Sequence, residues 1–143
     1  MNWKRFAAAF IGVLILTALM NFVIHAVLLK ADYAAQPALI RSEADGSAHM
    51  LYLMLAFVIF ALGFTLLWDK WARDRRTGVA DGLVFGILAW LLVSVNRYLT
   101  YYAVQPWPAS VVCKQIVYEL VWCLSAGILV ALIYGRGPAP QRS

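Results

Sequence analysis

The chain has 143 residues, of which 64% are hydrophobic and 13% are charged, and its formal net charge is +5. Ordinary soluble domains are about 45–50% apolar and about 25% charged, so the composition excludes an ordinary soluble domain. A transmembrane helix needs about 20 predominantly apolar residues, and four segments meet this requirement. They leave too little chain for a soluble catalytic domain, a nucleotide-binding fold or a DNA-binding domain.

The predicted spans form a single membrane domain, residues 1–143. In chain order they are Phe6–Leu29, Met50–Trp68, Gly82–Val104 and Val111–Tyr134. The first resembles a secretory signal peptide in its basic start at Lys4 and Arg5, but its apolar stretch exceeds the about 7–15 residues of a signal core. We therefore expect an all-α membrane four-helix bundle of two antiparallel transmembrane hairpins, followed by a flexible polar tail at 135–143.

Basic residues are distributed unevenly between the two sides of the predicted bundle. The N-terminal segment, the middle loop and the tail carry eight of them: Lys4, Arg5, Lys70, Arg73, Arg75, Arg76, Arg136 and Arg142. The other two loops carry only Lys30 and Arg41. Because basic residues near span ends stay in the cytoplasm, both termini are expected there. Orientation and contact with anionic lipid also explain the positive charge without a nucleic-acid partner.

Two loops are expected on the side opposite the termini. The first, Lys30–His49, should lie along the membrane surface. The second, Gln105–Ser110, is short, and its prolines on either side of Trp107 end the third helix and make the last two spans a tight hairpin. Tryptophans near span ends are expected to anchor the membrane interface; they are Trp3, Trp68, Trp71 and Trp107.

Two short patterns indicate how the helices are related and packed. The pentapeptides Tyr-Ala-Ala-Gln-Pro at Tyr33 and Tyr-Ala-Val-Gln-Pro at Tyr102 agree at four of five positions, 69 residues apart, which indicates an internal duplication of the hairpin. Small residues recur every four positions on the last two spans, where they allow close backbone packing inside the bundle. They are Gly78, Gly82 and Gly86 on the third span and Cys123, Gly127, Ala131 and Gly135 on the fourth.

Polar side chains within the spans gather toward the side opposite the termini. An ionisable residue within a span costs at least about 2.5–3.5 kcal/mol on insertion scales and usually faces the bundle interior. A rise of about 1.5 Å per residue places Arg97 and Glu119 at similar depths, so we expect an ion pair, with Gln115 and Asn21 as hydrogen-bond partners.

Such a network has two interpretations. It either neutralises itself and fixes helix register, or it lines a polar pocket, open outward, that binds a small anionic ligand or a lipid headgroup. The candidate ligand-binding residues are Asn21, His25, Asn96, Arg97, Lys114, Gln115 and Glu119.

His25 and His49 are the two histidines of the chain and the candidates for binding a metal. Haem ligation by both, or copper binding with nearby methionines, would use them, but dense Met and Cys ligand motifs are missing from the sequence. We therefore expect no metal and no other cofactor. The sequence has no recognisable catalytic motif, although an intramembrane enzyme using His25 or Glu119 as a base remains an open alternative.

The segment Asn21–Tyr33 and the run Tyr101–Pro106 resemble parts of a group of small bacterial integral membrane proteins of similar length. The resemblance implies a multi-pass protein of the bacterial inner membrane and carries no activity with it. We expect a non-enzymatic accessory or interaction component of a membrane complex, surrounded by lipid, with another membrane protein or a second copy as partner. The alternative is a binding or transport protein that uses the outer polar pocket.

Overall fold

The computed structural model describes residues 2–73 and 77–135. Within these ranges it contains helices and no strand, in the following order: α1 (Trp3–Asn21), η1 (Phe22–Leu28), α2 (Lys30–Ala34), α3 (Glu43–Ala48), α4 (Met50–Ala72), α5 (Val79–Trp90), η2 (Leu91–Val95), α6 (Asn96–Val104) and α7 (Ala109–Tyr134). The fold is the expected all-α four-helix bundle. The expected tail lies outside the described residues beyond Gly135, as do Arg75, Arg76, Arg136 and Arg142.

Four helical stretches are long and apolar enough to cross a membrane: Trp3–Leu28, Met50–Ala72, Val79–Val104 and Ala109–Tyr134. The first, third and fourth stretches begin two or three residues before the predicted spans. The second stretch ends at Ala72, four residues after its predicted end. The helices continue into polar residues at the ends of the apolar segments, such as Lys70 and Asp81. Backbone hydrogen bonds hold these residues in the helix whether or not their side chains are apolar.

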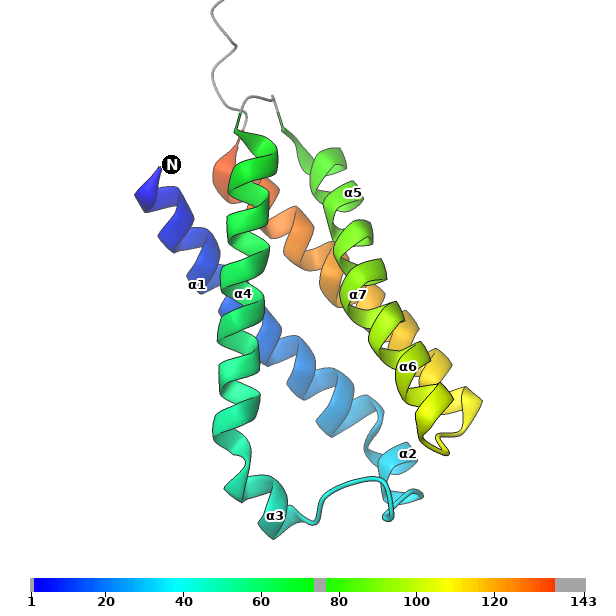
Figure 1. Cartoon of the computed structure of the whole chain (residues 1–143). Coiled ribbons are helices and arrows are strands. Elements are labelled where there is room, and N and C mark those ends of the chain that lie inside the picture. The colour runs from blue at the N-terminus through cyan, green and yellow to red at the C-terminus, as the bar shows by residue number, and fades with distance from the viewer. Residues whose placement is uncertain (1, 74–76, 136–143) are drawn as a thin grey trace, which may run out of the picture.

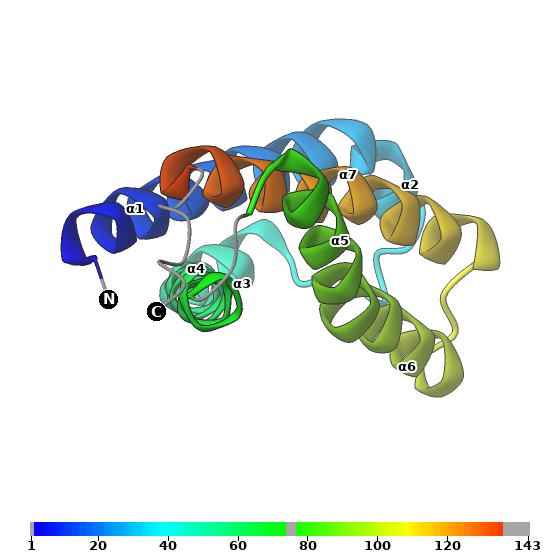
Figure 2. The same ribbon diagram turned by 90° about the horizontal axis from the view of Figure 1, so that it is seen from above.

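The four spans form two hairpins that share a common layer. α1 packs against α4 and α7 packs against α5, while α1 and α7 also pack against each other. Figure 2 shows α1 and α7 side by side, with α4 and α5–α6 on the same side of that layer. In Figure 1, α4 and α5–α6 diverge away from the end that carries the N-terminus. We call that end the terminal end, and the opposite end, which carries α2 and α3, the distal end.

The closest packing is between α5 and α7. A Cβ built on Gly82 would lie 2.4 Å from the carbonyl oxygen of Gly127, and one on Gly86 would lie 2.6 Å from that of Cys123. The small-residue pattern therefore predicts this helix contact correctly. Gly78 and Gly135 take no part, since a Cβ there would meet nothing within 4 Å.

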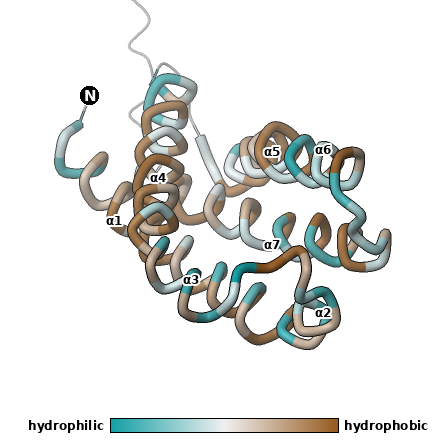
Figure 3. The backbone as a smooth tube through the Cα atoms, turned by 60° about the horizontal axis from the view of Figure 1, so that its bottom comes forward, coloured by the Kyte–Doolittle hydropathy of each residue, from teal (hydrophilic) through white to brown (hydrophobic). Residues whose placement is uncertain are grey.

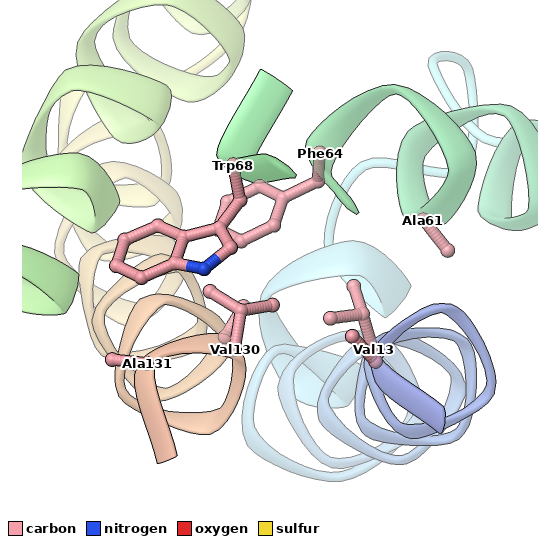
Figure 4. Packing of buried hydrophobic residues seen from close by; sticks show 8 residues of the cluster. Val13, Ala61, Phe64, Trp68, Val130 and Ala131 are labelled. Atoms are coloured by element: carbon pink, nitrogen blue, oxygen red, sulfur yellow. The ribbon is translucent and has the colours of Figure 1, made fainter. Parts of the chain in front are cut away.

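An apolar core near the terminal end joins α4 to α1 and α7. Trp68 is fully buried in it, with its ring beside Val130 in the close-up of Figure 4. The expectation that Trp68 anchors the interface is wrong, because its ring turns inward and packs edge-on against Phe85, with 5.3 Å between centroids. Trp107 is likewise only 9% exposed and packs against Tyr33. The distal segments α2 and α3 are more hydrophilic than the spans (Figure 3).

Two of the membrane-crossing stretches contain π-helical segments, in which a backbone N–H bonds five residues back instead of four; η1 ends the first stretch and η2 lies within the third. Leu29 N donates to Ile24 O at 2.9 Å after η1, and Asn96 N donates to Leu91 O after η2. The segments begin at residues 22 and 91, and this 69-residue offset equals that of the repeated pentapeptides. The first helix of each hairpin thus has the same irregularity at the equivalent position.

Candidate functional site

A buried carboxylate is the centre of the candidate site. Glu119 on α7 is 1% exposed, and its Oε1 lies 2.5 Å from Nη2 of Arg97 on α6. The hydroxyl of Tyr98 donates to the same oxygen, and the Arg97 guanidinium lies 4.6 Å from the centre of the Tyr98 ring. The predicted Arg97–Glu119 ion pair is confirmed, and Tyr98 joins it because it is the neighbour of Arg97 on the same helix.

His25 connects this carboxylate to α2. Its Nε2 lies 3.6 Å from Glu119 Oε1, and its Nδ1 lies 2.6 Å from the hydroxyl of Tyr33. The Tyr33 oxygen accepts a hydrogen bond from Gln115 Nε2 at 3.0 Å, so its own proton is available for Nδ1 of His25. A neutral His25 then carries its proton on Nε2, the nitrogen nearer Glu119.

Tyr33 closes the distal side of the cluster. Its ring stacks on that of His25 at 5.9 Å, with 9° between the planes, and packs edge-on against Trp107 at 6.0 Å. Burial raises the pKa of the Tyr33 hydroxyl above its ordinary value, which keeps it protonated and able to donate. Sequence reasoning did not place Tyr33 at the site, although its repeated pentapeptide marked the segment.

Both π-helical segments contact α7, the helix that carries Glu119. η1 contains His25, and η2 contains the fully buried Ser94 and is followed directly by the segment that carries Arg97. π-helical turns are frequent at functional sites because they break the regular helical register. The second carboxylate oxygen of Glu119 and the Nε of Arg97 are buried and form no hydrogen bond within the described residues. The cluster therefore retains unused hydrogen-bonding capacity.

A cavity of about 400 Å³ adjoins the cluster at the distal end; we call it the distal cavity. Four of the predicted site residues line it: Asn21, His25, Arg97 and Gln115. Aromatic and polar side chains from α2, α6 and the α6–α7 loop complete much of its wall: Tyr33, Tyr98, Tyr101, Gln105 and Trp107. None of the described residues that line it is an acid, because Glu119 lies behind Arg97 and outside the lining.

The remaining predicted residues lie elsewhere. Lys114 is exposed, and its ammonium lies 2.8 Å and 2.9 Å from the two carboxylate oxygens of Asp32 on α2. Asn96 is exposed on α6 and does not line the distal cavity. Neither residue is positioned to contact a ligand there.

The expected hydrogen-bond partners of the ion pair are also different. Asn21 Nδ2 donates to the carbonyl of Thr17 at 3.0 Å, four residues back on the same helix, and Gln115 donates to Tyr33. The expectation failed because an Asn amide reaches its own helix backbone easily, and because the position of α2 could not be derived from helical spacing.

The two histidines lie in separate surroundings. His49 Nδ1 lies 2.7 Å from the carbonyl oxygen of Asp45, on the helical turn before it. The described part of the chain contains no group of three or more His, Cys, Asp or Glu residues that could hold a metal ion. Cys113 and Cys123 are both free thiols.

No protein-family model, curated protein or solved structure matches this chain.

Proposed function

We propose that this multi-pass membrane protein binds a small anionic ligand or headgroup in the distal cavity. The observation that carries the proposal is the placement of charge at the cavity wall. Arg97 lines the cavity with 39% of its side chain exposed, whereas its partner Glu119 is 1% exposed and lies behind it. A ligand in the cavity therefore meets the cation before the carboxylate.

The size and lining of the cavity support binding over a purely structural role. Ligand sites are typically concave, about 300–1,000 Å³, with a mainly apolar and aromatic wall and a few convergent polar groups. The distal cavity has this volume, and Leu39, Ile40 and Leu53 complete the wall beside its aromatic and polar residues. Arg97 is partly exposed at this wall, where a ligand can reach its guanidinium.

The chemistry of Arg97 suits an anionic ligand. An anion in the cavity would lie beside its guanidinium, which offers the planar set of donors that suits carboxylate and phosphate.

The second proposal is the accessory role in a membrane complex that was expected from the sequence. It relies on the exposed apolar faces of the spans, such as Leu51 and Leu92, which lipid would cover equally well. Location in the bacterial inner membrane, with both termini cytoplasmic, is proposed from the sequence resemblance and from the distribution of Lys and Arg.

The proposal is tested by calorimetric titration of the purified protein with sulfate, inorganic phosphate, acetate and glycerol 3-phosphate. We expect at least one of these anions to bind, and the folded double variant Arg97→Gln, Glu119→Gln to bind it at least about tenfold more weakly. Lys114→Gln is the matched control, since it removes a cation outside the cavity. Equal binding by the double variant, or no binding of any probe by folded wild-type protein, would overturn the proposal.

A further inference from the structure

A second cavity lies between α4 and α5–η2, at the depth of the membrane spans. Its volume is about 410 Å³, and its lining is predominantly apolar. We call it the apolar groove. Its lining includes Phe60, Gly63, Leu67, Leu92 and Val93. Such a groove within a span needs an apolar occupant, because hydrocarbon surrounds it.

The groove and the distal cavity lie along the same opening between helices. On α4, Leu53 lines the distal cavity, while Phe60 and Leu67, each seven residues further on, line the groove. On the opposite wall, Val93 lines the groove and Arg97, four residues later, lines the distal cavity. Residues seven apart lie on one face of a helix, so both cavities share one face of α4, and residues of α5, η2 or α6 line the opposite wall of each. They border the space between α4 and α5–α6, which Figure 1 shows widening toward the distal end.

Gly63 gives this groove part of its width. Glycine is among the least favourable residues in a helix, and within the spans it usually allows close contact with another helix. Gly82 and Gly127 do so, but a Cβ on Gly63 would meet nothing within 4 Å. The missing side chain at Gly63 therefore leaves space that no helix of the described chain fills.

We infer that the ligand of the distal cavity is an anionic lipid, with its headgroup beside Arg97 and one acyl chain in the apolar groove. The inference rests on the proposed function and adds the class of ligand. Charge complementarity selects an anion at the distal end, since Arg97 lines that cavity and no acid does among the described lining residues. From Leu53 to Leu67 the α4 wall is about 21 Å long at about 1.5 Å per residue, which exceeds half of a hydrocarbon core of about 30 Å.

The inference is tested by filling the groove without touching the cavity. Gly63→Phe places a ring in the open space, and Leu62→Phe is the matched control, because Leu62 is 42% exposed on the same helix. Each protein is solubilised in micelles that contain 1-palmitoyl glycerol 3-phosphate, and the lipid retained is measured by native mass spectrometry. Binding of glycerol 3-phosphate, which has no acyl chain, is measured separately by calorimetry.

We expect wild-type protein and Leu62→Phe to retain one lipid, and Gly63→Phe to need at least about tenfold more lipid for equal occupancy. Glycerol 3-phosphate binding should be unchanged in both variants, and the zwitterionic lipid with the same chain should be retained less than the anionic one. Unchanged lipid retention by Gly63→Phe, or capture of a protein by a photo-crosslinker at Leu67, would overturn the inference while the cavity proposal stands. Failure of both lipid and glycerol 3-phosphate to bind would overturn both.

Discussion

Gly82 and Gly127 bring the backbones of α5 and α7 into direct contact. A Cβ built on Gly127 would lie 2.0 Å from the carbonyl oxygen of Gly82, so neither position has room for a side chain. This contact sets the distance between the two helices whose distal halves hold Arg97 and Glu119. The geometry of the charged cluster thus depends on a contact that lies fifteen residues from Arg97 on one helix and eight residues from Glu119 on the other.

Gly127→Ala is expected to destabilise the protein by about 1–3 kcal/mol, the usual cost of inserting atoms into a packed core. The cause is steric, since the added methyl group meets backbone rather than a flexible side chain. Thermal unfolding in detergent measures the change. Gly63→Ala is the control: it adds the same methyl group in open space and should leave stability equal or higher, and equal melting temperatures for the two variants would contradict the assignment.

Arg97→Gln alone is expected to be more destabilising than the double variant Arg97→Gln, Glu119→Gln. Removing one partner of a buried pair typically costs about 3–5 kcal/mol, and we expect the lower end because Arg97 is 39% exposed. The single variant leaves Glu119 charged and buried, whereas the double variant removes both charges. A double-mutant cycle of unfolding free energies checks this, and simple additivity would show that the two side chains do not interact.

Tyr33→Phe is expected to lower stability by about 1–2 kcal/mol, because it removes the hydroxyl that bonds Gln115 and His25. It should also change the response to alkaline pH. Since burial raises the pKa of Tyr33 in the folded state, its contribution to stability is complete below the unfolded pKa of about 10 and is lost as the pH rises through the folded value. Unfolding curves at increasing pH should therefore fall less steeply for Tyr33→Phe, and parallel curves would contradict this.

Lys114→Gln is expected to change stability by less than about 1 kcal/mol, because exposed ion pairs contribute little. Its partner Asp32 lies on the short helix α2, so hydrogen exchange of α2 should increase slightly. Anion binding should remain at the wild-type level. A loss of binding in this variant would show that Lys114 contacts the ligand after all.

The spans, the α5–α7 contact and the Arg97–Glu119 pair could all be predicted because each depends on position along a helix. Apolar length defines a span, four-residue spacing defines a face, and rise per residue defines depth. Depth in the membrane alone does not predict the direction of a side chain. Trp68 lies near a span end, as an interface anchor would, but its ring is buried in the core.

The rest of the site depends on rotation and on loop placement, which spacing does not reveal. Lys114 and Gln115 are neighbours on α7, yet one bonds Asp32 and the other bonds Tyr33, because α2 folds back over that part of the helix. Tyr33 could not be assigned to the cluster without the position of α2. The π-helical segments were also missed, since apolar residues such as Leu91 and Leu92 look the same in an α-helix.

The π-helical segment η2 determines the direction in which the distal part of its helix faces. A π turn takes about one residue more than an α turn, and one residue corresponds to about 100° around a helix of 3.6 residues per turn. Without that extra residue between Leu91 and Val95, Arg97 would point about a quarter turn away from Glu119. The segment therefore rotates the second half of the span relative to the first. As a result, one continuous span presents glycines to α7 in its first half and Arg97 to the same helix in its second.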